Sequence, residues 1–484
     1  MRQRSTKRGM QRARAAPCKG FAASATLNMW IRRGLAVTAI VLAFPAAAQE
    51  AKPSGEPDGI FAQERLTRDW GGIRKRLEDA GVKLQANEQS EVWDNLAGGK
   101  KTGSTYNGLT TPSLTLDMER LFHWQGATFF VNAFQIHGMG PSTALVGNQQ
   151  FLSNIEATAA TKLYQLWIEQ TLFGGRVNIR IGQEGANDEM MISQTAQLFL
   201  NSSFGYPDLL EQDLPSGGPN YPLATPMIRT KVKLTDGVTY VNAIFNGDPA
   251  GPGPGDPQHR DETGTAFRLT DPPLIFNEFW FQVGGDEKPA VLPGTYKIGS
   301  WVHTGRFNDQ SRDGSALPLA SPLNSRVPAH YRGDYAFYFV ADQMVWRKAA
   351  AKDQGISLFG LIMGAPADRN PENLYIEGGF NWKGTIDSRP DDILGIAFGY
   401  AQTSGALRQF GEESIAFTGT GKRFGANETV IEATYLYQAA PWWTFQPDLQ
   451  YVIHPGAALP PSGPGIELPL KNSLTVGVRT KIDF

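Results

Sequence analysis

The chain contains a single cysteine, Cys18, so no disulfide can form within it. Histidine is also scarce, because the 6 His residues include no HExxH pair and one cysteine cannot make a CxxC motif. The 45 Lys and Arg residues nearly match the 47 Asp and Glu residues, and the net charge is only −2. This balance lacks the basic surplus of nucleic-acid-binding proteins. We therefore expect no disulfide framework, no metal or other cofactor, and no nucleic-acid partner.

Long hydrophobic runs are also nearly absent. One short run, residues 34–44, follows Arg32 and Arg33 and leads into alanines 46–48. This order predicts an export signal over residues 1–48, with cleavage after Ala48. The run is shorter than the roughly 20 apolar residues that a membrane-spanning helix needs. Residues 1–28 are basic and lack an apolar period, so we interpret them as an extension from a misassigned start before Met29.

Residues 49–81 form a polar lead that ends in a predicted short helix. Asp69 can cap the start of this helix, Ile73 and Leu77 share one face, and Gly81 can end it. We find no sustained helical period after Gly81.

From residue 82 to the end, apolar and polar residues alternate, and the last segment shows this most clearly. One face of that segment carries Leu474, Val476, Val478, Thr480, Ile482 and Phe484, and the other carries Thr475, Gly477, Arg479, Lys481 and Asp483. Successive side chains of a strand point to opposite faces, so one face here is apolar and the other charged. A final aromatic on the apolar face is typical of a strand in a bacterial outer-membrane barrel, where the apolar row meets lipid.

The same alternation recurs at 82–87, 114–119, 164–169, 177–181, 228–234 and 443–451. In the segment 164–169 it places Tyr164 on the apolar side, opposite Trp167 and Glu169. Gly- and Pro-rich segments predict long loops at 204–225, 246–265, 306–333 and 406–427. Only every second strand residue of a membrane barrel must be apolar, which fits a hydrophobic content of 41%. We therefore predict an all-β chain whose residues 82–484 form a transmembrane antiparallel β-barrel.

Several blocks resemble the carbohydrate-selective porin family of OprB type. They are LTRDWGGIR at 66–74, RIGQ at 180–183, FLNS at 199–202, PGTY at 293–296, HTGRF at 303–307, RPDD at 389–392, WWTFQPDLQY at 442–451, HPG at 454–456 and VRTKIDF at 478–484. One departure is Glu88, where the family has an aromatic residue. The resemblance implies a barrel of about 16 strands in which each chain forms its own pore. It also implies that glucose-like monosaccharides pass by facilitated diffusion across the outer membrane of a Gram-negative bacterium.

The alternation also predicts which side chains face the lumen. The acids of this set are Glu91, Asp117, Glu119, Glu169, Glu432, Asp448 and Asp483, and the bases are Arg180, Arg229, Lys231, Lys233, Lys297, Arg479 and Lys481. A balanced wall of this kind offers donors and acceptors to a neutral polyol, whereas a wall of one sign selects ions. The candidate substrate-pathway residues are Glu91, Asn95, Trp167, Glu169, Arg180, Arg229, Lys231, Glu432, Asp448 and Gln450. We assign Trp442, Trp443 and Tyr451 to the interfacial aromatic belt.

Two other functions remain open at this point. Arg229, Lys231 and Lys233 on one strand face favour a general or anion-preferring porin. A secreted all-β protein that binds or cleaves glycans is the alternative of another class. No pair of carboxylates has the context of a glycosidase, so we predict that the chain is not an enzyme. Its expected partners are small sugars, outer-membrane lipid and the barrel-assembly machinery, the last through the strand that ends at Phe484.

Overall fold

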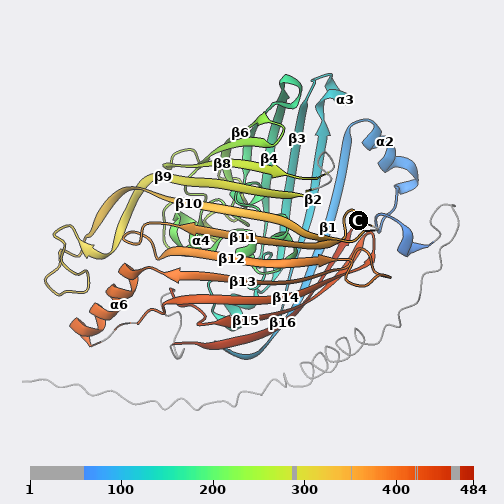
Figure 1. The fold of residues 1–484 in the computed structure, drawn as a ribbon. Coiled ribbons are helices and arrows are strands. Elements are labelled where there is room, and N and C mark those ends of the chain that lie inside the picture. Colours follow the sequence, from blue (N-terminus) through green and yellow to red (C-terminus); the bar gives the residue numbers. More distant parts are fainter. Residues whose placement is uncertain (1–58, 286–290, 350, 420, 422, 459–468) are drawn as a thin grey trace, which may run out of the picture. The chain divides into compact units, whose positions relative to one another are not determined.

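A computed structural model describes residues 59–484 of the chain, apart from 286–290, 350, 420, 422 and 459–468. The predicted export signal, residues 1–48, and the predicted extension 1–28 lie outside the described residues. The described strands form one closed barrel in which each strand pairs with its sequence neighbours (Figure 1). Strand β1 closes the ring by pairing antiparallel with β16. The predicted all-β antiparallel barrel is therefore confirmed.

The barrel has 16 strands. They are β1 (Val82–Gly99), β2 (Gly103–Asp117), β3 (Ala127–Gly138), β4 (Ala160–Leu172), β5 (Val177–Glu184), β6 (Thr225–Thr235), β7 (Val238–Asn246), β8 (Pro273–Val283), β9 (Gly294–Asp313), β10 (Pro328–Arg347), β11 (Gly355–Gly364), β12 (Glu372–Lys383), β13 (Ile393–Thr403), β14 (Asn427–Ala440), β15 (Trp443–Ile453) and β16 (Lys471–Asp483).

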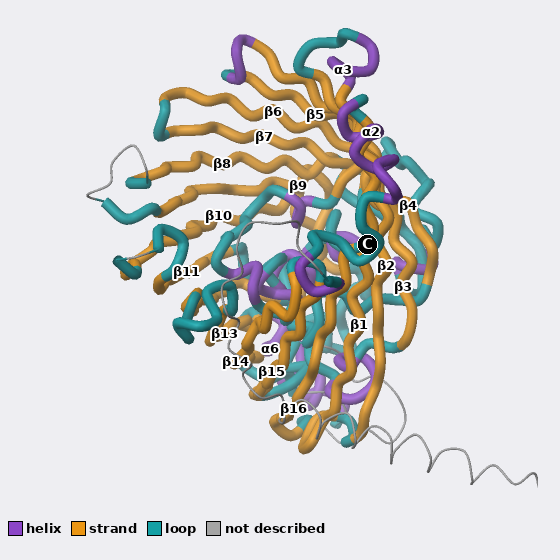
Figure 2. The backbone as a smooth tube through the Cα atoms, turned by 90° about the vertical axis from the view of Figure 1, so that its right-hand side faces the viewer, coloured by secondary structure: helices purple, strands orange, loops and turns teal. Residues whose placement is uncertain are grey.

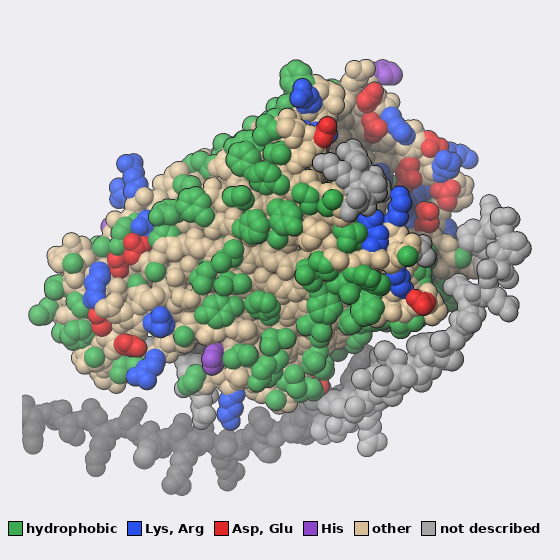
Figure 3. All heavy atoms as spheres, in the orientation of Figure 1, with side chains coloured by type: hydrophobic (Ala, Val, Ile, Leu, Met, Phe, Trp, Pro, Cys, Tyr) green, Lys and Arg blue, Asp and Glu red, His purple; other side chains and the backbone are tan. Residues whose placement is uncertain are grey.

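The alternation in the sequence becomes the two faces of the wall. On β1, Glu91 and Asn95 are buried toward the lumen, whereas Val92 and Leu96 between and beside them are exposed. The outer surface seen in Figure 3 carries hydrophobic side chains over the middle of the wall, and charged side chains gather toward its two ends. An apolar band between polar ends is the surface that a membrane barrel presents to lipid.

The described helices are short. They are α2 (Ile73–Asp79), α3 (Met118–Phe122), α4 (Asp208–Asp213), α5 (Pro257–Arg260) and α6 (Gly405–Thr418), with 3-10 turns and one π turn between strands. No helix among the described residues is both long enough and apolar enough to cross a membrane.

Two loop predictions were wrong. Helix α6 occupies most of the predicted loop 406–427: the Ser404 hydroxyl caps its start by accepting from the Leu407 N–H, and Gly419 ends it in a left-handed conformation. The predicted loop 306–333 is also too long, because β9 continues to Asp313 and β10 begins at Pro328. The alternating burial of residues 307–313 shows that this stretch belongs to the wall.

Asp117 and Glu119 do not belong to the predicted charged wall. The Asp117 carboxylate instead caps α3 by accepting hydrogen bonds from the Glu119 and Arg120 N–H groups, each at 3.1 Å. This cap ends β2 and turns the chain before Glu119 could occupy a strand position.

The N-terminal segment packs across the end of the barrel where β1 and β16 meet. The predicted helix appears as a 3-10 turn, Trp70–Gly72, followed by α2, and Gly81 takes a positive φ of 96°. The Leu66 N–H donates to the Asp483 carbonyl at 2.9 Å, and Arg74 donates to the Phe484 carbonyl oxygen at 3.2 Å.

The prediction that Trp442 belongs to the interfacial aromatic belt was wrong. It is buried, and its indole N–H donates to the Ile60 carbonyl at 2.8 Å, so the N-terminal segment covers it. Trp443 and Tyr451 remain on the outward parity of β15.

Two long connections turn into the barrel rather than away from it. We call residues 139–159, between β3 and β4, the first inner loop, and residues 185–224, between β5 and β6, the second inner loop. Figure 2 shows helical and loop segments inside the ring of strands. Many residues of both loops are fully buried, including Val146, Leu152, Leu200 and Leu209. The two loops therefore narrow the lumen, and the candidate functional site lies between them.

Candidate functional site

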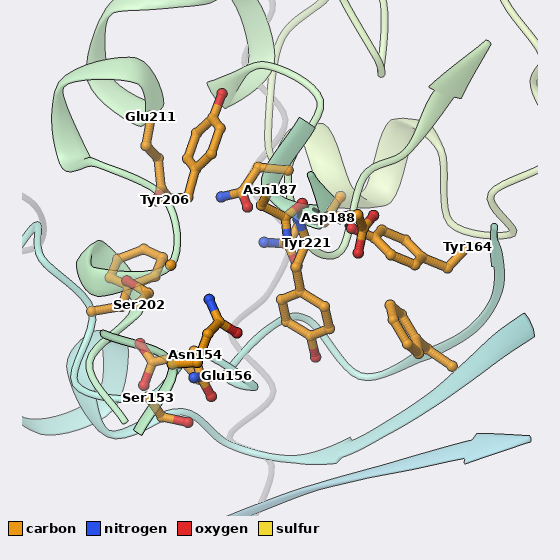
Figure 4. A pocket seen from close by; sticks show the side chains of 16 residues that line it. Ser153, Asn154, Glu156, Tyr164, Asn187, Asp188, Ser202, Tyr206, Glu211 and Tyr221 are labelled. Atoms are coloured by element: carbon orange, nitrogen blue, oxygen red, sulfur yellow. Dashed lines mark hydrogen bonds between the residues drawn. The ribbon is translucent and has the colours of Figure 1, made fainter. Parts of the chain in front are cut away.

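A polar cavity of about 180 Å³ lies between the two inner loops (Figure 4). The first inner loop contributes Phe151, Ser153, Asn154 and Glu156, and the second contributes Asn187, Asp188, Gln197, Ser202, Gly205, Tyr206, Glu211, Asn220 and Tyr221. The wall adds Phe134 and Tyr164, and the loop after β7 adds Gln258. The cavity thus combines aromatic rings with hydroxyl, amide and carboxyl groups, and its lining includes no Lys or Arg.

Aromatic rings form one side of the cavity. The rings of Phe134 and Tyr164 stack with their centroids 4.3 Å apart, and Tyr221 lies 5.3 Å from Phe134. The Tyr164 hydroxyl donates to Asn187 at 2.9 Å, and the Tyr221 hydroxyl donates to the Ile155 carbonyl at 2.8 Å. These bonds join β4, the first inner loop and the second inner loop, and they hold the ring faces in place.

A β-bulge in β4 turns the Tyr164 side chain toward this cavity. The sequence predicts that Tyr164 lies on the apolar outer side, opposite Trp167. The pairing of β3 with β4 shifts register between Val131 and Ala133, and Tyr164 is consequently buried on the inner side. Because a bulge adds one residue to one strand, it reverses the faces beyond it. The outward prediction for Tyr164 was therefore wrong.

Two residues that line the cavity each carry a buried polar atom with no hydrogen-bond partner within the described residues. These atoms are Oε1 of Glu156 and the hydroxyl of Tyr206, on side chains that are only 5% and 2% exposed. The other Glu156 oxygen accepts from the Ser142 N–H at 3.0 Å. In Figure 4, Glu156 and Tyr206 come from different loops, on opposite sides of the cavity. The Tyr206 hydroxyl points away from the cavity in Figure 4, and both unpartnered atoms are buried, so neither is in contact with the open space of the cavity.

The carboxyl groups of the cavity lie on loops, outside the membrane-spanning strands. Burial raises the pKa of Glu156 to about 8, and the neighbouring charge of Glu91 adds to this rise. Burial likewise raises the pKa of Glu211 to about 8 and that of Asp188 to about 6. Glu156 is among the charges that raise the pKa of Glu211. Arg180 opposes the rise in the pKa of Asp188, and no base opposes the rises at Glu156 and Glu211.

Side chains of the opposite wall hold the inner loops in position. Glu432 on β14 accepts from the backbone N–H groups of Leu200 and Asn201 at 2.6 and 3.0 Å. Gln450 on β15 donates to the Leu152 carbonyl at 2.8 Å and to Asp448 at 3.0 Å. These three wall side chains are almost fully buried. Glu432 and Gln450 anchor both loops across the lumen, and Asp448 holds the Gln450 side chain.

A second group of polar residues, the paired-charge feature, lies on β4, β5 and β6 and on the second inner loop. Glu169 lies 2.7 Å from both Arg180 and Arg229, and Glu189 contacts Arg229 and Lys231. The Arg180 guanidinium also lies 4.0 Å over the Trp167 ring. Each base thus has a carboxylate partner, and the lumen wall here carries both signs.

The profile described as carbohydrate-selective porin, OprB family, matches residues 101–484. The chain belongs to the OprB family of carbohydrate-selective porins. Together with the closed 16-strand barrel, this membership makes it a sugar porin of the Gram-negative outer membrane, as the sequence predicts.

Two curated proteins are similar to this OprB-family chain. It is 23% identical to Porin B of Pseudomonas aeruginosa over 435 residues, which cover 86% of this chain and 90% of that protein. It is 22% identical to "Putative porin QuiX" of Acinetobacter baylyi over 424 residues, which cover 82% and 90%. Among solved structures, the high-pH structure of Pseudomonas putida OprB superposes with a TM-score of 0.77 at 21% identity, covering 88% of this chain and 100% of that one. That superposition supports the fold.

The ten predicted pathway residues of this OprB-family porin fall into separate groups, and none lines the cavity. Glu432 and Gln450 anchor the inner loops and Asp448 holds Gln450. The paired-charge feature consists of Trp167, Glu169, Arg180, Arg229 and Lys231. Asn95 donates to the Gly98 and Lys101 carbonyls in the turn after β1. Glu91 pairs with Arg479 at 2.5 Å, and Arg479 donates to Asn154 of the cavity. Contact between any of the ten and a sugar stays a prediction.

The cavity residues escaped sequence analysis because alternation applies only to strands. Most of the lining comes from the inner loops, which have no period that would reveal their inward path. One usable signal was the FLNS block at 199–202, which the family resemblance singles out and which ends with the lining residue Ser202.

Proposed function

We propose that small sugars cross this porin through the cavity between the inner loops, one molecule at a time. The observation that carries this proposal is the lining of the cavity, which combines aromatic rings with hydroxyl, amide and carboxyl side chains. Sugars bear hydroxyls around an apolar ring, so they suit a site with aromatic faces and hydrogen-bonding groups. The volume, about 180 Å³, is below the roughly 300–1,000 Å³ of pockets for drug-sized ligands, which favours a monosaccharide.

Binding in this cavity has to be weak enough for release. Most lining groups already bond to protein, which leaves few strong contacts for the solute. The sugar therefore exchanges water contacts for a few protein contacts and moves on down its concentration gradient. The proposal contains no catalytic step.

A general or anion-preferring porin remains the alternative in the same fold. The bases that suggested it, Arg229 and Lys231, are paired with Glu169 and Glu189, so no specific observation favours strong anion selectivity. Current recordings in planar bilayers separate the two functions. Sugar that blocks the ion current supports the sugar pathway, whereas strong anion selectivity without block contradicts it.

The cavity itself is tested by glucose uptake into reconstituted liposomes. Replacing Tyr221→Phe removes the hydroxyl that joins the two inner loops at the cavity, and we expect glucose uptake to change about two- to fivefold because one hydrogen bond that holds the lining in place is lost. Tyr240→Phe is the matched control, since Tyr240 lies on β7 outside the cavity and donates to Asn277. Equal uptake by both variants would place the sugar path elsewhere.

Three further assignments belong to the same proposal. Residues 1–48 act as the export signal, residues 49–81 as the lead, and 82–484 as the barrel. The apolar outer row contacts outer-membrane lipid, and the strand ending at Phe484 engages the barrel-assembly machinery. Recovery of the protein from the soluble periplasm after cell fractionation would contradict these assignments, and would favour the secreted glycan-binding alternative.

A further inference from the structure

Two arginines lie directly opposite each other on the outer wall of the barrel. Arg306 on β9 pairs in register with Arg332 on β10, and both side chains are exposed. Directly opposed residues of antiparallel strands have Cα atoms only about 4.5–5.5 Å apart, so two like charges in these positions repel each other. Neither guanidinium makes a hydrogen bond or an ion pair with another described residue. We call these two residues the arginine pair.

The acids near the arginine pair do not neutralise it. Along these stretches of β9 and β10 the acids are Asp309, Asp313 and Asp334, and all three are buried on the inner face. Asp368 lies beside β9, but it forms an ion pair with its neighbour Arg369 at 2.8 Å. The outer wall therefore carries two adjacent positive charges without a counter-charge from the described protein.

The arginine pair lies toward the end of the barrel that carries the long loops. In Figure 1, β9 and β10 run side by side to this end, and their connection, residues 314–327, is long. The connections at the other end include short turns, such as residues 236–237 between β6 and β7. In outer-membrane barrels the short turns face the periplasm and the longer loops face outward. The arginine pair is therefore on the side of the outer leaflet.

The outward row of β9 places the pair at the boundary of that leaflet. The row begins with Tyr296, an aromatic residue of the kind found in interfacial belts, and continues through the exposed Ile298 and Val302. Arg306 comes ten positions after Tyr296. A strand that rises about 3.3 Å per residue and tilts by about 40° gains roughly 25 Å over this span, which is the height of the apolar band. The guanidinium groups therefore lie where the headgroups of the outer leaflet begin.

This part of the wall suits a lipid that carries phosphate. Each guanidinium presents a planar set of donors that matches phosphate oxygens, and a phosphate between the two groups replaces their repulsion with charge-assisted hydrogen bonds. On the membrane side of the pair, the outward row of β10 exposes Tyr335 and Phe337, at 45% and 68%. The same surface thus offers donors to a headgroup and apolar side chains to its acyl chains.

We propose that Arg306 and Arg332 together bind a phosphate of lipopolysaccharide, the phosphorylated glycolipid of the outer leaflet. Anionic phospholipids and inorganic phosphate share the phosphate oxygens. The glycolipid is the source to which we assign the site, because the pair faces the outer leaflet and adjoins an apolar surface for acyl chains. The site lies on the outside of the wall, so it does not depend on the path that sugars take through the lumen.

The test measures binding of lipopolysaccharide to the folded full-length porin in detergent by native mass spectrometry. We expect the double variant Arg306→Gln/Arg332→Gln to bind lipopolysaccharide at least about tenfold more weakly, because the charge-assisted hydrogen bonds to phosphate are lost. Arg176→Gln is the matched control, since Arg176 is an exposed arginine in the turn between β4 and β5, at the opposite end of the barrel. This control should bind like the unaltered porin. Equal binding by the double variant would overturn the proposal.

Three further ligands identify the source of the phosphate. On the unaltered porin, dephosphorylated lipopolysaccharide, phosphatidylglycerol and inorganic phosphate should each bind at least about tenfold more weakly than intact lipopolysaccharide. Binding of the dephosphorylated form at full strength would show that phosphate is not recognised, and equal binding of either other ligand would contradict the assignment to the glycolipid. The double variant should melt in detergent no lower than the unaltered porin, because it removes a repulsion between like charges. Should it fail to fold, the four ligands on the unaltered porin decide the matter alone.

Discussion

The carboxylate of Glu432 on β14 accepts a hydrogen bond from the backbone N–H of Leu200 at 2.6 Å, although the two residues are 232 positions apart in sequence. The bond crosses the lumen and fastens the second inner loop to the opposite wall. The porin thus uses a lumen-facing acid to hold the loop that narrows its own channel.

Removing this anchor should widen the pore. In Glu432→Ala the buried N–H groups of Leu200 and Asn201 lose their acceptor, at a cost of about 1–3 kcal/mol per unsatisfied group, so the second inner loop detaches from the wall more often. We expect larger and noisier single-channel conductance and weaker discrimination between mono- and disaccharides in liposome swelling. Glu119→Ala on α3 lacks such a role and serves as the control. Unchanged conductance in Glu432→Ala would show that other contacts suffice to hold the loop.

Cation preference should rise with pH. A carboxyl group is neutral below its pKa and negative above it, so Asp188 gains charge around pH 6 and Glu156 and Glu211 around pH 8. The other charged groups near these carboxyls are Glu91 and Arg479, which pair with each other, and Arg180, which faces Asp188 and pairs with Glu169 and Glu184. Reversal potentials under a salt gradient between about pH 5 and pH 9 measure the effect. A preference that falls with rising pH would contradict the acidic character of the cavity.

Arg229 should matter more for stability than its neighbour Lys233. Arg229 is buried between Glu169 and Glu189, so Arg229→Met leaves two carboxylates without this partner and should lower the free energy of unfolding by about 3–5 kcal/mol. Lys233 is half exposed and pairs with the exposed Asp236, so Lys233→Met should cost less than about 1 kcal/mol. Urea unfolding in lipid vesicles, followed by tryptophan fluorescence, compares the two. Similar losses for both variants would contradict the assignment.

Glu88, the departure from the family's aromatic position, faces outward and lies 3.4 Å from His137. On the same outward row of β1, Leu84 and Val92 flank it on either side. His137→Leu would leave the acid without this partner toward lipid, and we expect a loss of about 1–2 kcal/mol in unfolding free energy. The double variant Glu88→Leu/His137→Leu should recover this loss, because an apolar pair replaces the polar pair. A double variant with a lower free energy of unfolding than His137→Leu alone would show that the pair itself stabilises the barrel.

Side-chain parity predicts the two faces of a strand wherever its alternation is unbroken. On β16, β15, β6 and most of β1, side-chain parity alone assigned the inner and outer faces correctly. It failed at Tyr164, because a bulge reverses parity, and at α6, because a capped helix of modest amphipathicity leaves no strong period. It also failed at Asp117, whose carboxylate caps α3 and does not belong to the charged lumen wall.

The sequence by itself determined the class of protein: alternating strands, a lipid-facing apolar row, a polar lumen and the blocks of the OprB family. These are local properties, since each depends on neighbours a few positions apart. Only the tertiary structure decided where solutes meet the protein. The cavity needs Glu156 and Tyr206 from two loops that fold inward, and wall residues from distant strands that hold those loops. Such contacts form only when the barrel closes, because closure brings β14 and β15 opposite the loops that follow β3 and β5.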